Sequence, residues 1–135
     1  MVREAEEVRK QQLPVETKTD HSAASAQNMA KAAAEILYEG KASNVVILKV
    51  QGLTLIADYF VIASVSNQRH GRALADRVLE GLSGVRQPDH VEGYEGGLWI
   101  LMDYGDLIVH VFREQERAFY GLERLWGDAP REEIG

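Results

Sequence analysis

Two apolar segments near the C-terminal end of the chain are joined by only four residues, and this connection constrains the fold more than any other feature. The segments are residues 98–102 and 107–112, which are rich in the β-branched and aromatic side chains typical of strands. The connection is Asp103-Tyr104-Gly105-Asp106. So short a link forces the strands into an antiparallel hairpin, and Gly105 can adopt the positive φ that such turns need.

Strands and helices alternate along the rest of the chain. Residues 44–50 and 59–65 are nearly all apolar, which predicts strands, the first of them buried on both faces. The spacing of apolar residues predicts three helices, which end at Gly40, extend from Ser66 or Asn67 to about Leu82, and span residues 114–126. With a short extra strand near residues 91–94, this order predicts an α/β fold, a single domain whose mixed β-sheet is flanked by helices.

The last predicted helix carries Ala118, Leu122 and Leu125 at positions i, i+4 and i+7. This spacing places all three on one helix face, so we expect them to be buried, with Phe119 and Trp126 beside them. The many charged residues of the same segment predict a polar outer face.

The two ends of the chain differ in composition from the middle. Residues 1–28 contain one Leu and no aromatic residue, so they cannot bury enough apolar surface to offset the entropy lost on ordering. We expect them to form a flexible N-terminal tail that is mobile or partly helical. The folded domain is predicted to span residues 29–130, and residues 131–135 are predicted to form a C-terminal tail.

The composition restricts the classes of function. The chain has no cysteine, which excludes disulfides and thiolate metal sites. Its 15 Lys and Arg against 21 Asp and Glu give a net charge of −6, which favours a basic partner. We expect no direct binding to DNA, because non-specific affinity for nucleic acid comes from cations. No apolar run is long enough to span a bilayer and no secretory segment follows Met1, so we expect no membrane partner and a cytoplasmic location.

Three carboxylates, Asp58, Asp103 and Asp106, lie at predicted strand ends. Paired carboxylates can hold Mg²⁺ for phosphoryl or nucleotidyl transfer, but Asp103 and Asp106 are three apart across a turn, a spacing that splays their side chains. We expect them to accept backbone N–H groups of the turn instead. The sequence has neither a glycine-rich phosphate loop nor the paired histidines of a zinc site, so no metal and no cofactor are expected.

Aromatic residues beside these carboxylates are typical of a protein–protein contact. Trp99 and Tyr104 lie on the hairpin, Tyr104 at the tip of the turn, where a place in the core is not expected. Trp99 alone is as compatible with core packing, and His110 with either a general base or a half-buried, hydrogen-bonded histidine. We place a partner-binding patch at one end of the hairpin, made of Trp99, Asp103, Tyr104, Asp106 and His110.

Three motifs resemble those of the ribosomal silencing factor family, RsfS, also called Iojap. They are ADYFVIAS (57–64) with SNQRH (66–70) and ALAD (73–76); VEGY (91–94) with WILMDYGD (99–106) and VHVF (109–112); and RAFYGLERLWGDA (117–129). They occur in the family's order, and the resemblance covers about residues 29–130. The family's pattern is intact at Asp58, Trp99, Asp103, Tyr104, Asp106 and His110, which adds Asp58 to the expected binding patch.

The resemblance implies a small α/β protein with a core similar to the nucleotidyltransferase fold but without its catalytic apparatus. It implies a partner, the large ribosomal subunit, bound at the subunit interface through protein number fourteen of that subunit. Joining of the small subunit is then blocked, and translation is repressed when nutrients are scarce. No enzymatic activity is implied, although a metal-dependent nucleotidyltransferase and a large-subunit assembly factor stay open as alternatives, as does a homodimer of the free protein.

Overall fold

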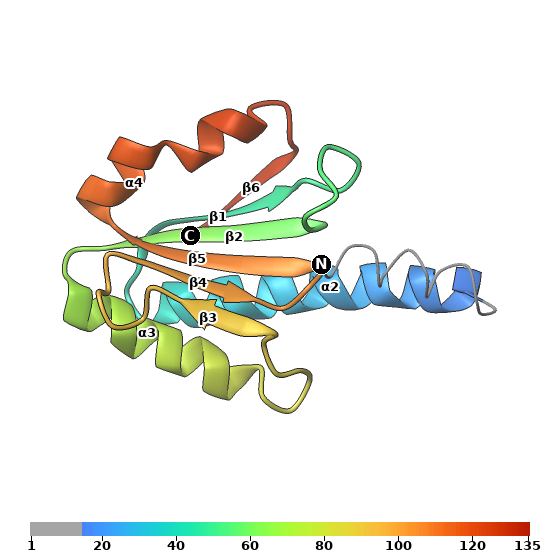
Figure 1. The fold of residues 1–135 in the computed structure, drawn as a ribbon, viewed down its shortest axis with the longest axis horizontal. Helices are drawn as coiled ribbons and strands as arrows, with labels where there is room; N and C mark the ends of the chain where they lie inside the picture. Colours follow the sequence, from blue (N-terminus) through green and yellow to red (C-terminus); the bar gives the residue numbers. More distant parts are fainter. Residues whose placement is uncertain (1–14) are drawn as a thin grey trace.

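The computed structural model describes residues 15–135, with side chains from residue 26 onward (Figure 1). In this part of the chain six strands form one sheet, in the order β3-β4-β5-β2-β1-β6. The strands are β1 (Ser43–Lys49), β2 (Tyr59–Val65), β3 (His90–Glu92), β4 (Trp99–Asp103), β5 (Leu107–Arg113) and β6 (Arg131–Ile134). The helices are α2 (Val15–Glu39), α3 (Gln68–Gly81) and α4 (Glu114–Tyr120), followed by the 3₁₀ helix η1 (Leu122–Trp126).

The sheet is mixed, and the predicted α/β class is confirmed. β2 and β5 pair in parallel at its centre, whereas the other neighbouring strands are antiparallel. Every residue of β2 is buried, as expected for a nearly continuous apolar run in the middle of a covered sheet. The hairpin of β4 and β5 and the short strand near residue 91 are also confirmed.

The two faces of the sheet are covered differently (Figure 1). α2 and α3 lie on one face, which we call the helix face, and α4 and η1 lie on the other, which we call the C-terminal face. Alternation along each strand divides the buried side chains between two cores. The core of the helix face contains Leu37, Val61, Leu74 and Val109, and that of the C-terminal face contains Phe60, Ile62, Ile108 and Phe112.

α3 follows its sequence pattern closely. The Asn67 side chain caps the helix by accepting a hydrogen bond from the backbone N–H of His70 at 2.8 Å. Leu74, Val78 and Leu82 are buried against the helix face, as their spacing predicts. Local signals therefore specify both the start of this helix and the side that it buries.

The prediction of one helix over residues 114–126 is wrong. α4 ends at Tyr120 because Gly121 adopts the left-handed conformation with φ 57°, and η1 follows in a new direction. Ala118, Phe119 and Leu125 are exposed as a result. Leu122 and Trp126 are partly buried against the C-terminal face.

The structure describes part of the predicted N-terminal tail and all of the predicted C-terminal one. α2 begins at Val15, and Ala26 is buried in the core, so the helix extends into the segment assigned to the N-terminal tail. The expectation for residues 1–14 lies outside the described residues. At the other end, β6 pairs with residues 45–48 of β1, whereas a C-terminal tail was expected over residues 131–135. Its side chains are mostly exposed and charged, so backbone pairing forms this strand without a hydrophobic pattern in the sequence.

None of the helices in the described part of the chain combines the length and apolarity needed to cross a membrane.

Candidate functional site

The turn between β4 and β5 is held by Asp103. Its Oδ1 accepts a hydrogen bond of 2.7 Å from the backbone N–H of Gly105, which has φ 88°. The Asp103 side chain is buried, and its Oδ2 lies 3.7 Å from Nδ1 of His90 on the neighbouring strand. Asp103 therefore caps the turn, as its spacing predicts.

Asp58 and Asp106 are brought together by the backbone. The carbonyl of Asp106 accepts hydrogen bonds from the N–H groups of Asp58 and Tyr59, at 2.8 and 3.0 Å. Both aspartates are half-buried at the same end of the sheet as the turn. Within residues 26–135, no group of three or more His, Asp or Glu side chains is placed to hold a metal ion.

Tyr104 does not occupy the exposed position expected at a turn tip. It is fully buried, with Ile100 and Met102, in the core of the helix face. Strand alternation continues one residue past β4 and turns the ring inward. Burial raises the pKa of Tyr104, and its hydroxyl has no hydrogen-bond partner among the described residues. The expectation that Tyr104 has no place in the core is therefore wrong.

Trp99 and His110 form a pair on the C-terminal face. The indole Nε1–H of Trp99 donates to His110 Nδ1 at 3.0 Å, so the neutral imidazole carries its proton on Nε2. His110 is buried, and desolvation lowers its pKa from 6.5 to about 3. A neutral, enclosed imidazole that orients Trp99 fits the interpretation of His110 as a hydrogen-bonded histidine better than that of a general base.

The aromatic cluster around Trp99 reaches the surface through α4. The Trp99 ring lies 4.7 Å from Phe112 and 4.9 Å from Tyr120, and Phe119 packs edge-on against Tyr120 at 5.1 Å, all measured between ring centroids. Phe119 is 80% exposed and Tyr120 53% exposed, whereas Trp99 is half-buried. We call Trp99, Phe119 and Tyr120 the aromatic patch.

Phe119 and Tyr120 were not predicted as candidate site residues. The pattern of a continuous helix placed Phe119 beside its buried face, and only the end of α4 at Gly121 leaves both rings exposed. The glycine directly after two aromatic residues is the one signal in the sequence that points to this outcome.

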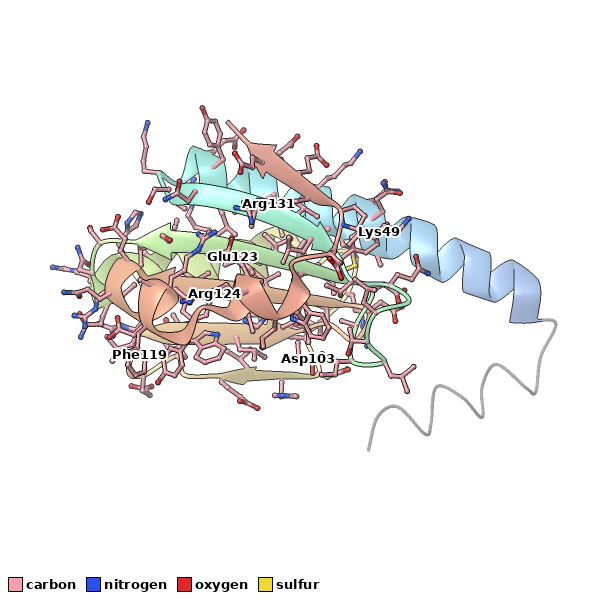
Figure 2. All side chains as sticks on the ribbon, turned by 90° about the horizontal axis from the view of Figure 1, so that it is seen from above. Lys49, Asp103, Phe119, Glu123, Arg124 and Arg131 are labelled. Carbon is pink, nitrogen blue, oxygen red and sulfur yellow. The ribbon has the colours of Figure 1, made fainter. Side chains whose placement is uncertain are left out.

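The predicted single patch is divided in the structure. Trp99 begins β4 and Asp103 ends it, so a rise of about 3.3 Å per residue separates them by about 13 Å. Figure 2 shows Phe119 and Asp103 at opposite ends of the sheet. His110 pairs with Leu101 between these ends, and Tyr104 lies on the other face. The six candidate residues thus fall into three parts. Trp99 and His110 form one pair, the three aspartates lie together near the turn, and Tyr104 belongs to the core of the helix face.

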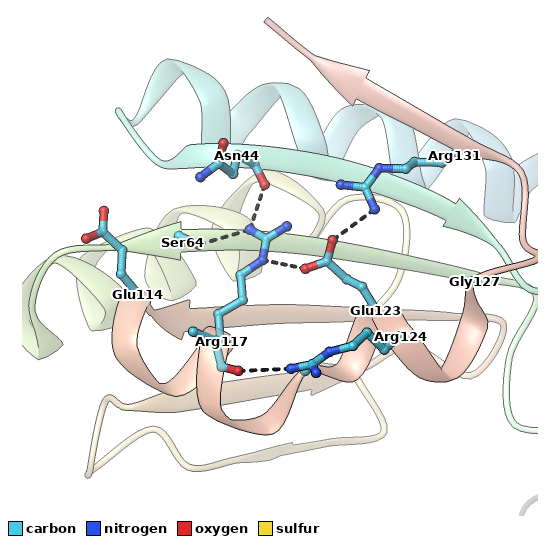
Figure 3. A pocket seen from close by; sticks show the side chains of 10 residues that line it. Asn44, Ser64, Glu114, Arg117, Glu123, Arg124, Gly127 and Arg131 are labelled. Atoms are coloured by element: carbon cyan, nitrogen blue, oxygen red, sulfur yellow. Dashed lines mark hydrogen bonds and ion pairs between the residues drawn. The ribbon is translucent and has the colours of Figure 1, made fainter.

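A cleft of about 650 Å³ lies between the α4–η1 segment and the strands β1, β2 and β6 (Figure 3). Arg117 crosses it, donating to the carbonyl of Asn44 at 2.7 Å, to Ser64 Oγ at 2.9 Å and to Glu123 Oε2 at 2.7 Å. Arg131 of β6 pairs with the other oxygen of Glu123 at 3.0 Å. The hydrogen bond from Arg117 and the two positive charges lower the pKa of Glu123.

This network ties the C-terminal segment to the sheet. Asn44 stands at an irregularity in β1 with φ 51°, and its carbonyl meets the guanidinium of Arg117. Glu123 pairs with both Arg117 and Arg131, and Arg131 also pairs with Glu133 at 3.3 Å. Two of the three arginines that line the cleft are thus held by carboxylates, which gives little support to a nucleotide-binding site, because such a site needs cations directed at phosphate.

Comparisons with known proteins find one family by sequence and a similar fold among solved structures. Residues 23–135 match the family described as "Ribosomal silencing factor during starvation". The chain is 40% identical over 110 residues to a ribosomal silencing factor of Halalkalibacterium halodurans, covering 80% of this chain and 93% of that protein. It is 37% identical over 102 residues to one from Bacillus subtilis, covering 74% and 86%. A crystal structure of a protein from Chromobacterium violaceum superposes with a TM-score of 0.73 at 33% identity, covering 76% of this chain and 86% of that one.

Proposed function

The chain belongs to the ribosomal silencing factor family, and we propose that it binds the large ribosomal subunit at the subunit interface and blocks joining of the small subunit. The contact runs through protein number fourteen of the large subunit, and translation is repressed when nutrients are limiting. The protein acts in the cytoplasm, as a binding protein and not as an enzyme.

The observation that carries this proposal is the aromatic patch. Two aromatic rings stand exposed on a structured helix, and a third supports them from the sheet. Soluble proteins seldom expose adjacent aromatic side chains without a partner, and such residues dominate the binding energy of many interfaces. The chain's net charge of −6 favours a basic protein over ribosomal RNA as the surface that covers them.

Trp99 and His110 contribute by fixing the base of the patch. Because the indole N–H of Trp99 is held by His110, the ring keeps one orientation against Phe112 and Tyr120. A side chain that is already ordered loses less entropy when a partner binds. In this proposal Trp99 and His110 therefore increase affinity through preorganisation, and His110 does so without touching the partner.

Steric exclusion is sufficient for silencing. A protein of this size seated on the interface of the large subunit prevents the small subunit from closing on the same surface, and no bond has to be made or broken. The proposal needs only a stable complex. Asp58, Asp103 and Asp106 act in it at longer range, by speeding the encounter with a basic surface and fixing its orientation.

The test is co-sedimentation with purified ribosomal subunits. We expect the protein to sediment with isolated large subunits and not with small ones, and to lower the yield of joined ribosomes as its concentration rises. Affinity should fall only moderately between low and physiological salt, because buried contacts are screened less than charges at the rim. Equal binding to small subunits, or normal joining with the protein bound, would contradict the proposal.

A further inference from the structure

A second exposed apolar surface lies in the connection between β1 and β2. Leu53, Leu55 and Ile56 are 47%, 77% and 50% exposed there. We call these three side chains the apolar loop. In Figure 1 this green connection projects from one end of the sheet, whereas α4 begins at the other end, so the apolar loop is distinct from the aromatic patch.

The backbone of this connection is held in place without help from the three side chains. The N–H groups of Val50 and Gln51 donate to the carbonyl of Asp58 at 2.9 and 3.0 Å, and Leu53 N–H donates to the carbonyl of Val50 at 2.9 Å. Thr54 Oγ1 accepts from Ile56 N–H at 3.1 Å. These bonds make the loop a formed surface, so its apolar side chains are presented to solvent in a fixed arrangement.

Ala57 anchors the end of the loop. It is buried in the core of the C-terminal face, directly after the exposed Ile56. A chain that needed more buried apolar surface here could have turned the larger side chains inward. The folded domain leaves three neighbouring apolar side chains exposed instead, and grouped exposed apolar residues are typical of contact surfaces.

Four aspartates lie at the end of the sheet from which the loop projects. Asp58 is joined to Asp106 by a backbone hydrogen bond, and Asp89 N–H donates to the carbonyl of Asp103 at 2.7 Å. Arg86 lies beside the turn and pairs with Asp89 at 3.0 Å. Two cations, Arg86 and the exposed Lys49 at the start of the loop, stand against these four aspartates, so this end of the sheet keeps an excess of negative charge beside the apolar loop.

We propose that the apolar loop and the nearby β4–β5 turn, with Asp58, Asp89, Asp103 and Asp106, form a second docking surface, which takes a cationic, amphipathic segment of a protein of the large ribosomal subunit. Apolar side chains of that segment cover Leu53, Leu55 and Ile56, and its Lys or Arg side chains face the carboxylates. The acidic surroundings repel phosphate, which selects protein over RNA. This inference rests on the proposed function and adds a second point of attachment at the opposite end of the sheet.

The first test compares two sets of exposed apolar residues. The triple variant Leu53→Ser, Leu55→Ser and Ile56→Ser should weaken binding to isolated large subunits on the order of tenfold, with an unchanged melting temperature. Tyr38→Ser is the control, because Tyr38 is 51% exposed near the C-terminal end of α2, away from the loop and the turn, and it should bind like wild type. If the triple variant melts early, Leu55→Ser alone replaces it, since that side chain is the most exposed of the three.

The outcomes separate the two proposals. If wild type does not bind large subunits, both the proposed function and the docking surface are wrong. If wild type binds, Phe119→Ala binds weakly and the loop variant binds normally, the function stands and the docking surface is wrong.

The second test identifies the occupant. A photo-crosslinking amino acid placed at position 55, and at position 38 as control, is activated in complexes with isolated large subunits. A crosslink from position 55 to a Lys- or Arg-rich segment of a ribosomal protein, absent from position 38, supports the proposal. A crosslink to ribosomal RNA or to a second copy of the chain, or none, overturns it.

Discussion

The two faces of the sheet use apolar side chains for different purposes. On the helix face, α3 buries Leu74 and Val78 completely, and α2 buries Leu37 in the same core. On the C-terminal face, neither α4 nor η1 has a fully buried residue, and Phe119, Tyr120 and Leu125 are exposed, although one side of the Tyr120 ring packs against Trp99. The helix face buries most of its apolar surface, whereas the C-terminal face leaves part of it exposed, where we propose that a partner binds.

A polar network replaces the missing apolar packing on the C-terminal face. Arg117, Glu123 and Arg131 connect α4, η1 and β6 to the sheet through bonds of 2.7–3.0 Å. Such a network fixes the position of a short helix without burying its aromatic side chains. The comparison therefore predicts that different residues determine stability and binding, and each experiment below tests that prediction.

The largest expected effect is a loss of stability on the helix face. Leu74→Ala should lower the free energy of unfolding by about 2–5 kcal/mol, because it removes buried methyl groups and leaves a cavity. Leu125→Ala, an identical change on exposed η1, should cost less than about 0.5 kcal/mol. Urea denaturation of both variants measures the difference. Similar losses would show that the C-terminal face is packed as tightly as the helix face.

Acid should destabilise the protein through His110, which lies under α4 and η1. Its folded pKa of about 3 is below the ordinary value of 6.5, so the unfolded chain binds a proton first. Stability is fully present above pH 6.5 and is lost as pH falls toward 3, by about 2 kcal/mol at pH 5 at 1.36 kcal/mol per pH unit. His110→Gln keeps an acceptor for Trp99 and should flatten the profile, as measured by denaturation at several pH values. If stability falls with pH equally steeply in both proteins, His110 is accessible to water in the folded state.

Binding should respond most to the exposed aromatic residues. Phe119→Ala should weaken binding to large subunits by about 2 kcal/mol, as expected for an aromatic anchor, while stability changes by less than about 0.5 kcal/mol. Calorimetry or sedimentation on the purified variant measures the first quantity and thermal melting the second. Tyr38→Ala, which alters an exposed aromatic residue of α2, serves as the control and should bind normally. Normal binding by Phe119→Ala would place the contact elsewhere.

The polar network should show an intermediate loss of stability. Arg117→Met leaves Ser64, the Asn44 carbonyl and Glu123 without their shared donor, at a cost of about 1–3 kcal/mol. Arg124→Met, on the same segment, removes a guanidinium that makes one 3.3 Å hydrogen bond to the Ala118 carbonyl and should cost less. Denaturation midpoints compare the two. Equal effects would indicate that the network does not hold α4 in place.

The sequence predicts the local parts of this structure and fails where distant segments meet. The hairpin and the Asn67 cap follow from short-range rules of turn length and capping, and both are confirmed. β6 and the division of residues 114–126 depend on pairing with β1 and on the conformation of Gly121, which no periodicity reveals. Predictions from sequence patterns therefore fail at the places where tertiary contacts override local preference.

The candidate site shows the same limit. The motifs direct attention to the hairpin, where Trp99 and Asp103 do lie, but the sequence order conceals that about 13 Å of strand separates them. The direction of Tyr104 depends on how far the pleat continues into the turn, and the exposure of Phe119 depends on where α4 ends. Both are properties of the assembled sheet.

The smallest expected effect concerns Tyr104, which places a polar group in the helix face. Its hydroxyl is buried without a partner among the described residues, and an unpaired buried hydroxyl reduces stability. Tyr104→Phe keeps the ring and removes this oxygen, so we expect a gain of up to about 1 kcal/mol in the free energy of unfolding, measured by urea denaturation. Binding to large subunits should be unchanged, because Tyr104 is covered on the face opposite the aromatic patch. A clear loss of stability would show that the hydroxyl is paired in solution. Weaker binding with unchanged stability would show that Tyr104 contributes to the partner-binding surface after all.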